Sequence, residues 1–478
     1  MQHGMRFVML VTLLVTGCAR QGSVDLQAPL PETAALPTVQ SQQLGEWCQA
    51  YLPSPLKSLT YRALKNNHDL SIARANLREA QASARAAGAS RLPNLNLEGS
   101  ASRSRLASVG GVSAAPGRRM DSTISRYRLG VAMQYELDFW GRVASEAEAV
   151  ALQADASWDD LQAARVTLSA EVAQRWFELV AIRQVIDLLQ TEVAAREQML
   201  ELVQLRFAQG QAQGLDVVEQ RQQTETIQGE LALTQAQAKM VTNELQILLG
   251  ESPLDTFVQQ QERGLPPLTP LPLEGIPANL LQLRPDLSAA GKRMAAADQQ
   301  AAAAVAERLP MVQLTAEAFA ESRTVTELFE QIFWNLLGSV NVVVFDGGRL
   351  KAQAEMADAQ AEAAMEQFAQ AYLTALAEVG NGLVLEQGRR SQLNSLRLQA
   401  EDADRALALS RTYYLQGVVD YLRVLNAQQQ RLHVQQSLIE AQRELLSSRL
   451  QTCRALGYAH AETDLTEELA PSGKASAL

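Results

Sequence analysis

Aromatic residues, cysteine and histidine are scarce in this chain. Of 478 residues, 5% are aromatic, three are cysteine and four are histidine. Three cysteines are too few for a disulfide framework, and the separation of Cys48 and Cys453 gives no evidence that they pair. Gly347-Gly348 lacks the lysine and the spacing of a phosphate loop. Metal-ligand spacing to cysteine or carboxylate partners is missing at all four histidines, which are His3, His68, His433 and His460. We therefore expect no enzyme, no metal and no cofactor.

The chain also has fewer basic than acidic residues. The chain has 42 Lys and Arg against 53 Asp and Glu, which gives a formal net charge of −11. Binding to nucleic-acid phosphates needs a basic face, and the sequence does not gather one anywhere. The composition therefore argues against a nucleic-acid partner. It is rich in Ala, Gln, Leu and Glu, which is typical of long helices and coiled coils.

The N-terminus lacks an apolar run long enough to span a membrane. The run from Phe7 to Val15 is shorter than the roughly 20 residues of a spanning helix, so residues 1–17 are predicted to be a signal peptide. The residues before Cys18 resemble a bacterial lipobox, whose cysteine becomes acylated, for instance with palmitate. Ala19 after it is typical of release to the outer membrane. The alternative is an ordinary signal peptide followed by a chance cysteine.

The sequence repeats itself. Arg91-Leu92-Pro93 returns as Arg308-Leu309-Pro310, a displacement of 308 − 91 = 217 positions. Farther along, the displacement becomes 417 − 210 = 207, which one indel of ten residues explains. The glycines that recur at this second displacement are Gly141, Gly210 and Gly250, which return as Gly348, Gly417 and Gly457. Two tandem copies therefore make up most of the chain and predict a quasi-symmetric molecule.

Proline marks the organisation of the chain. It clusters near the N-terminus and around residues 253–277, and it is absent from residues 117–252 and 311–470. Because proline interrupts helices, the proline-free stretches can hold long helices. The predicted division is a signal peptide at 1–17, a lipidated extension at 18–55, a first repeat at 56–252, a linker at 253–276, a second repeat at 277–458 and a flexible tail at 459–478.

Each copy predicts one long helix and two short ones. Residues 143–209 contain neither Pro nor Gly, and a helix of this length measures roughly 100 Å. Its counterpart at 350–416 contains glycines, at which we expect a bend: Gly380, Gly382 and Gly388. The short helices are expected at 59–89 and 215–249 in the first copy, and at 277–307 and 419–456 in the second. Two short helices laid end to end would match one long helix, forming an antiparallel coiled coil.

A period of two precedes each long helix. Apolar residues alternate with polar or small ones from Leu95 to Ala101 and from Leu129 to Phe139, which predicts a hairpin within residues 93–139. The second copy predicts a hairpin within residues 311–345, with strands around Val312 to Ala318 and Val340 to Val344. Alternation over about ten residues is typical of strands in a transmembrane barrel.

Four strands are too few to close a barrel in lipid. An exposed edge leaves backbone donors and acceptors unsatisfied, at several kcal/mol for each group. Known barrels have at least about eight strands, so strands that enter the membrane require a dimer, a trimer or a tetramer. The alternative is that short hairpins lie on a soluble periplasmic rod.

Three motifs occur in a fixed order along the two copies. They are the Leu-Pro strand starts at Leu92-Pro93 and Leu309-Pro310, Arg284-Pro285-Asp286-Leu287, and Phe345-Asp346-Gly347-Gly348-Arg349. Together with the tandem helix-hairpin-helix pattern, they resemble the outer membrane factors of bacterial efflux systems, in particular the OprM-like lipoprotein branch, with TolC more distant. The resemblance covers nearly the whole mature chain.

The resemblance implies a mainly α fold with a transmembrane β-barrel. In the family, three identical chains form one twelve-stranded barrel, which is continued by a long periplasmic α-helical barrel of coiled coils. The expected function is an exit duct in the bacterial outer membrane that passively conducts drugs or other toxic small molecules. The implied partners are two further chains of the same protein, which complete a homotrimer, outer-membrane lipid, a periplasmic adaptor (membrane fusion) protein and an inner-membrane efflux pump.

The family also implies a gate where the long helices end. Its periplasmic entrance is held shut by contacts between neighbouring coiled coils, and by position Asp216 and Tyr414 match latch residues. Val419 stands where a latch arginine is usual, and Arg423 and Asn426 stand where acidic residues are usual, so the closure chemistry must differ. The candidate gate residues are Asp216, Tyr413, Tyr414, Asp420, Arg423 and Asn426, and the candidate adaptor-docking turns contain Gly210, Gly214 and Gly417. For each polar residue the alternative is a solvated position beside a helix turn.

A competing interpretation is a structural or adhesive coiled-coil periplasmic lipoprotein without a lumen. A lumen predicts polar or small residues on one strand face, and Gln134, Glu136 and Asp138 fit that pattern. A spacer has no need of two-faced strands.

Overall fold

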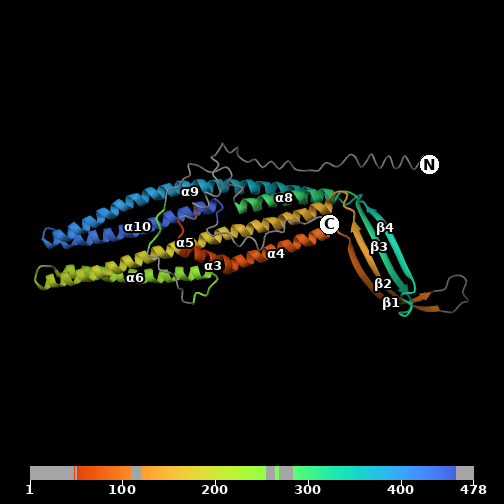
Figure 1. Ribbon diagram of the computed structural model, residues 1–478, viewed down its shortest axis with the longest axis horizontal. Helices are drawn as coiled ribbons and strands as arrows, with labels where there is room; N and C mark the ends of the chain where they lie inside the picture. Colours follow the sequence, from red (N-terminus) through yellow and green to blue (C-terminus); the bar gives the residue numbers. More distant parts are fainter. Residues whose placement is uncertain (1–47, 49–50, 109–119, 255–263, 269–283, 459–478) are drawn as a thin grey trace. The chain divides into compact units, whose positions relative to one another are not determined.

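The structure is a computed structural model that describes residues 48, 51–108, 120–254, 264–268 and 284–458 (Figure 1). Its residues cluster into two compact units. One unit contains the described residues within 77–157 and 289–369, and the other contains those within 31–76, 158–288 and 370–478. The predicted signal peptide, Cys18 and the C-terminal tail lie outside the described residues.

The two copies contain the same kinds of element in the same order. The first copy has α3 (Ser54–Asn66), α4 (His68–Ala89), β1 (Asn94–Ser108), β2 (Met120–Glu136), α5 (Arg142–Ala208) and α6 (Gly214–Leu248). The second copy has α8 (Pro285–Ala306), β3 (Met311–Ser322), β4 (Ile332–Asn341), α9 (Arg349–Leu415) and α10 (Tyr421–Ala455). The predicted fold class, mainly helical with strands contributed by a tandem repeat, is confirmed. Within the described part of the chain, no helix has the length and apolar character that crossing a membrane would need.

The strands form one antiparallel sheet in the order β1-β2-β3-β4 (Figure 1). The ladder between β2 and β3 joins the hairpin of one copy to the hairpin of the other. The register places the apolar residues of the alternating pattern on one face, where Leu97 pairs with Val131 and Ala318 pairs with Trp334. The opposite face is largely polar, and Ala132 pairs there with Glu317. The alternation predicted a two-faced sheet, and the register confirms it.

Several predicted strand ends are wrong, since β2 begins at Met120 instead of Leu129 and β4 begins at Ile332 instead of Val340. β4 covers Ile332–Asn341, so Val342 and Val344 follow the strand instead of forming it. Its last residue pairs with Met311, the first residue of β3, and the preceding Pro310 has no N–H with which to extend the ladder. Phe139 likewise lies beyond the end of β2 at Glu136. Apolar residues continue past both strand ends, which is why alternation alone placed the boundaries too late.

One helix prediction also needs correction. The first short helix is divided at Asn67, which adopts an extended conformation with φ −61° and ψ 134°. The second long helix, α9, is continuous from Arg349 to Leu415, and the bend expected at its glycines stays a prediction. Gly382 has a role in packing, because a Cβ at this position would lie 2.6 Å from Oγ1 of Thr452 on α10. This glycine permits close packing between α9 and α10. Residues 277–283, the expected start of a short helix, lie outside the described residues.

The turns show why the glycines recur. Gly210 and Gly417 both have positive φ, 75° and 73°, in the turns after the two long helices. Gly250 and Gly457 have φ of 69° and 79° after the shorter helices. Each of these glycines follows a helix C-terminus, where a left-handed residue lets its N–H and the next one bond the last carbonyls.

The interhelical caps are also repeated, but with different side chains. Asn67 Nδ2 donates to the carbonyl of Leu248, the last residue of α6, at 3.0 Å. At the equivalent place in the second copy, Arg284 Nη1 donates to the carbonyl of Ala455, the last residue of α10, at 2.9 Å. Arg284 also binds Asp286 at 2.7 Å and Glu378 of α9 at 2.8 Å. The Arg-Pro-Asp-Leu motif therefore fastens the C-terminus of α10 to two other helices.

Gly250 gives a sharp test of this scheme. A Cβ there would lie 2.4 Å from the carbonyl oxygen of Asn66, and the backbone has positive φ, so we expect Gly250→Ala to destabilise the protein by about 1–3 kcal/mol. The matched control is Gly229→Ala on the exposed face of α6, where a Cβ meets nothing within 4 Å and alanine favours the helix. The measurement is the thermal unfolding of both variants in detergent. Equal unfolding temperatures would contradict the proposed contact.

Candidate functional site

The helix ends beside the two turns that follow the long helices pack together in one hydrophobic cluster. Its buried residues come from α5, α9 and α10, and they are Met199, Val203, Leu407, Tyr414, Tyr421, Val424 and Leu425. Val217 of α6 and Val419 of the second turn pack against them. The structure therefore brings together the two segments that the sequence assigned to a gate.

Two tyrosines form the polar centre of this cluster. The rings of Tyr414 and Tyr421 meet edge to face, with their centroids 5.6 Å apart. The Arg206 guanidinium lies 4.7 Å from the centroid of the Tyr414 ring. The Tyr421 hydroxyl donates a hydrogen bond to Oε1 of Gln220 on α6, and burial holds the pKa of Tyr421 above its ordinary value, so this donor stays protonated. The hydrogen bond links the first copy to the second.

Burial also raises the pKa of Tyr414, whose hydroxyl is enclosed without a hydrogen-bond partner in the described part of the chain. Asp216 lies close enough to add to this effect by its charge, but no hydrogen bond between the two is present among the described residues. Instead, Oδ2 of Asp216 accepts the Gln213 N–H at 3.0 Å and so caps the start of α6. The structure thus gives Asp216 a capping role beside Tyr414.

The other candidate gate residues are on the surface of the chain. Asp420 caps α10 by accepting the Arg423 N–H on its carboxylate at 3.1 Å. The side chains of Arg423 and Asn426 are exposed on the first turns of α10, and Tyr413 is 44% exposed at the end of α9. Gly210 and Gly417 form the turns, and Gly214 begins α6 beside the Phe207 ring. These residues lie near one another, but they do not form one bonded network in the described part of the chain.

A second polar group lies farther along the helices, and the sequence analysis missed it. Glu192 of α5 is 3% exposed and accepts hydrogen bonds from Arg196 at 3.1 Å and from Arg431 of α10 at 3.3 Å. Arg431 also binds Asp404 of α9 at 2.6 Å. Arg196 is fully buried, and its backbone carbonyl accepts from Gln220 at 2.8 Å. This group, which we call the Glu192 network, connects α5, α6, α9 and α10.

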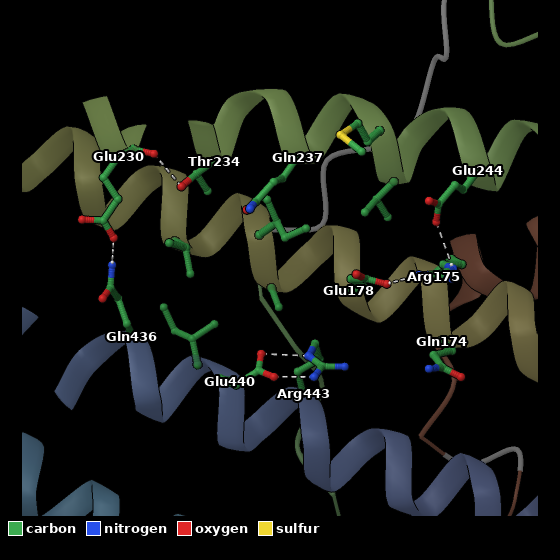
Figure 2. A pocket seen from close by; sticks show the side chains of 16 residues that line it. Gln174, Arg175, Glu178, Glu230, Thr234, Gln237, Glu244, Gln436, Glu440 and Arg443 are labelled. Atoms are coloured by element: carbon green, nitrogen blue, oxygen red, sulfur yellow. Dashed lines mark hydrogen bonds and ion pairs between the residues drawn. The ribbon is translucent and has the colours of Figure 1, made fainter. Parts of the chain in front are cut away.

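A groove of about 730 Å³ runs between α5, α6 and α10. Figure 2 shows that its charged side chains bind one another across or along the helices. Arg175 contacts Glu178 at 2.8 Å and Glu244 at 3.2 Å, and Gln436 donates to Glu230 at 2.6 Å. No set of three or more His, Cys, Asp or Glu able to hold a metal ion occurs in the ranges that the structure describes. The groove joins helices and offers no evident reactive group.

Comparisons with known proteins find matches along most of the length of this chain. A family model described as outer membrane efflux protein matches residues 59–251 and 276–458. The pyoverdine export outer membrane protein OpmQ of Pseudomonas aeruginosa is 30% identical over 455 residues, which cover 93% of this chain and 96% of that protein. The cation efflux system protein CusC of Escherichia coli K12 is 26% identical over 440 residues, which cover 90% of this chain and 94% of that protein.

The fold is also found in solved structures. The outer-membrane channel OprN is similar with a TM-score of 0.82 and 26% sequence identity, over 89% of this chain and 97% of that one. The likeness extends through the helices and the strands because almost the whole of each chain is matched.

The Glu192 network predicts a large response to a small change. Glu192→Gln removes the negative charge between two arginines and leaves Arg196 buried without a carboxylate, so we expect a loss of about 3–5 kcal/mol. Glu201→Gln, on an exposed position of the same helix, is the control and should change stability by less than about 0.5 kcal/mol. Chemical unfolding followed by circular dichroism measures both. A Glu192→Gln protein as stable as the control would contradict the role given to this carboxylate.

Proposed function

Because the chain belongs to the outer membrane efflux protein family, we propose that it forms the outer-membrane exit duct of a tripartite efflux system. The duct passively conducts small molecules that an inner-membrane pump and a periplasmic adaptor deliver to it. The observation that carries the proposal is the open sheet: its apolar face is exposed in a single chain, and its two outer strands each have one edge without a strand partner in the described part of the chain.

The exposed face consists of large apolar side chains. Leu95 and Leu97 of β1 are 67% and 75% exposed, and Trp334 and Leu336 of β4 are 79% and 61% exposed. Monomeric soluble proteins rarely expose a continuous apolar patch of this kind, whereas lipid would cover it. A spacer without a lumen gives no reason for such a face, and this disfavours the structural lipoprotein.

The sheet edges favour assembly with identical chains. β1 and β4 are the outer strands, and each has one side without a strand partner among the described residues. Pairing β4 of one chain with β1 of the next chain satisfies both edges, and three chains supply the twelve strands expected for the family. We place the acylated Cys18 in the same membrane, as a lipid anchor beside the barrel.

Cargo is proposed only by chemical class. OpmQ is named for pyoverdine export and CusC for cation efflux, although the two are about equally similar to this chain. Similarity at this level therefore does not select a cargo. Drugs and other toxic small molecules fit a passive duct whose selection is made by the pump. The family consists of channel and transport proteins, and we propose no catalytic step for this chain.

The gate is proposed at the hydrophobic cluster formed by the two turns. Contacts between the hairpins α5/α6 and α9/α10 hold the closed arrangement, and a partner that binds the open arrangement better shifts the equilibrium toward it. The proposed gate residues are Asp216, Tyr413, Tyr414, Asp420, Arg423 and Asn426, to which the structure adds Gln220 and Tyr421. The turns at Gly210, Gly214 and Gly417 are the proposed docking points for the adaptor.

Conductance tests the proposed function directly. We expect the purified protein to migrate as a heat-sensitive trimer on unboiled gels and to form ion-conducting channels in planar bilayers. Boiled protein serves as the control for both measurements. A stable, monodisperse monomer that stays soluble without detergent and shows no conductance would favour the spacer.

The gate has its own test. Tyr421→Phe removes the hydrogen bond to Gln220 while keeping the ring, so we expect a higher single-channel conductance or a longer open time. The combined Asp216→Ala and Tyr414→Ala variant, which removes the Tyr414 ring from the cluster, should act in the same direction. Tyr61→Phe, at an exposed tyrosine of α3 outside the proposed gate, is the control and should behave like the wild type. If all three variants conduct alike, the closing contacts lie elsewhere.

A further inference from the structure

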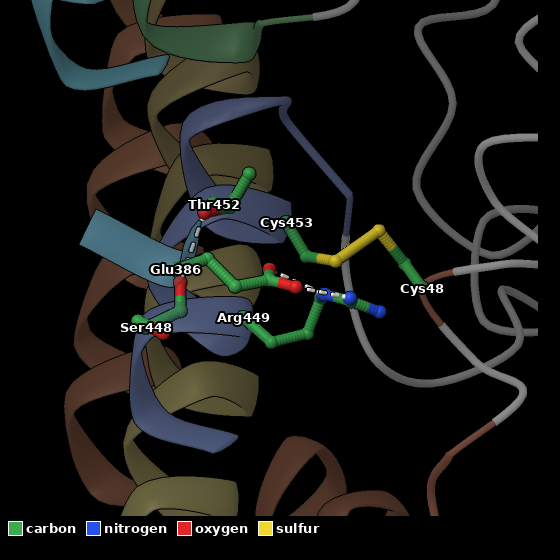
Figure 3. The surroundings of a disulfide bond; sticks show 6 residues. All are labelled: Cys48, Glu386, Ser448, Arg449, Thr452 and Cys453. Carbon is green, nitrogen blue, oxygen red and sulfur yellow. Dashed lines mark hydrogen bonds and ion pairs between the residues drawn. A yellow bond between two sulfur atoms is a disulfide. The ribbon is translucent and has the colours of Figure 1, made fainter. Parts of the chain in front are cut away.

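A disulfide joins the two ends of the tandem repeat. Cys48 lies before the first copy, Cys453 lies in the last turn of α10, and the two are 405 positions apart in sequence. Figure 3 shows the bond beside the ion pair formed by Glu386 and Arg449. Both cysteines have no exposed surface. The sequence offered no evidence for this pairing, since the repeat pattern relates neither cysteine to the other.

The surroundings of the disulfide contain buried polar and charged side chains (Figure 3). Arg449 lies one helical turn before Cys453, and its Nε donates to Oε2 of Glu386 at 2.7 Å. Neither side chain is more than 1% exposed, and Arg390 adds a second cation to Glu386 at 3.2 Å. Burying an ion pair is costly unless its hydrogen bonds are complete and water is excluded. The stability of the Glu386–Arg449 pair therefore depends on the side chains that keep water away from it.

The segment that follows Cys48 provides part of that cover. Tyr51 is 7% exposed, and the Arg449 guanidinium lies 6.0 Å from the centroid of its ring. The same ring stacks on Phe177 of α5, with centroids 6.4 Å apart. Leu52 and Leu56 are also buried. The residues after Cys48 thus pack against α5 and α10 immediately next to the ion pair.

We propose that Cys48–Cys453 is a permanent covalent clamp that keeps this N-terminal segment over the Glu386–Arg449 pair. A clamp is useful here because the proposed lipid anchor, Cys18, lies 30 positions before Cys48 in the sequence (48 − 18). A force on the anchored N-terminus acts first on the segment that begins at Cys48. The covalent bond transfers that force to α10 and leaves the cover in place.

The bond forms by thiol–disulfide exchange in the oxidising compartment outside the inner membrane. One cysteine thiolate attacks the disulfide of a protein disulfide donor, and a mixed disulfide forms. The second thiolate displaces the donor, which leaves as a dithiol. The chain thereby loses two electrons and two protons to the donor. Because both sulfurs are buried in the folded protein, the exchange precedes the packing of the segment.

Burial also distinguishes a clamp from a redox switch. A reductant must reach a sulfur atom to open the bond, and neither sulfur is accessible without local unfolding. The first experiment counts maleimide additions to the wild-type protein by mass spectrometry. At Cys48 and Cys453, identified by peptide mapping so that Cys18 does not enter the count, we expect no addition in denaturant without reductant, one addition at each after reduction in denaturant, and none after treatment of the folded protein with a water-soluble phosphine. A free thiol at Cys48 or Cys453 in the untreated protein, or ready reduction of the folded protein, would overturn the proposal.

The second experiment tests what the clamp holds. In the Cys48→Ser/Cys453→Ser double variant, we expect amide hydrogen exchange at residues 51–56 to rise by about tenfold or more, while exchange at the α5/α6 turn stays as in the wild type. Tyr51→Phe is the matched control, since its buried hydroxyl has no hydrogen-bond partner among the described residues and the disulfide is kept. Unchanged exchange at residues 51–56 in the double variant would refute the clamp.

The outcome is separable from that of the proposed function. The double variant should keep wild-type conductance, because the bond lies away from the cluster of turns. If the wild-type protein itself does not conduct ions, this result contradicts the proposed duct and has no bearing on the clamp. If the double variant does not fold, the maleimide experiment on the wild type still decides whether the bond is present and protected.

Discussion

The unpaired backbone groups at the edges of the four-stranded sheet are the constraint on which the rest of the molecule depends. The two hairpins meet through the β2–β3 ladder, so duplication has already removed two of the four edges that separate hairpins would have. The edges that remain, on β1 and β4, can be satisfied in lipid only by another chain. Pairing between the two repeats therefore satisfies two of the four hairpin edges, and assembly with other chains satisfies the remaining two.

Duplication fixed the backbone more strictly than the side chains. The matched positive-φ glycines recur because each helix ends in a conformation that other residues adopt only under strain. The caps at Leu248 and Ala455 occupy equivalent places, but one is made by Asn67 and the other by Arg284. A neutral amide holds a single carbonyl, whereas the guanidinium also binds two carboxylates. In the first copy an ion pair at this end is made instead by Arg62 and Glu251, so the two copies use different side chains for the same purpose.

The sequence predicted the features that depend on periodicity and on backbone conformation. The long helices, the two-faced strands and the glycine turns all leave regular signals. The long helices were located to within a few residues, whereas β2 begins at Met120 instead of Leu129 and β4 at Ile332 instead of Val340. The Glu192 network left a weaker signal, although Asp404 and Arg431 lie at nearly equal distances from Gly417, 13 and 14 residues, as an antiparallel hairpin requires. The disulfide and the Tyr421–Gln220 bond left none, because their partners are far apart in sequence and their pairing depends on how the helices pack.

The contacts along α10 differ in kind from one end to the other. Its C-terminal end is held by the disulfide, by Arg284 and by the buried Glu386–Arg449 pair, each of which is costly to break. Its first turns are held to α6 by a neutral hydrogen bond from Tyr421 and by the apolar cluster, and the ion pairs of Arg431 follow about three turns farther along. A neutral hydrogen bond contributes only about 1 kcal/mol net. Movement of this helix is therefore least costly in the turns before Arg431, where the gate is proposed, with the rest of the helix as the fixed part.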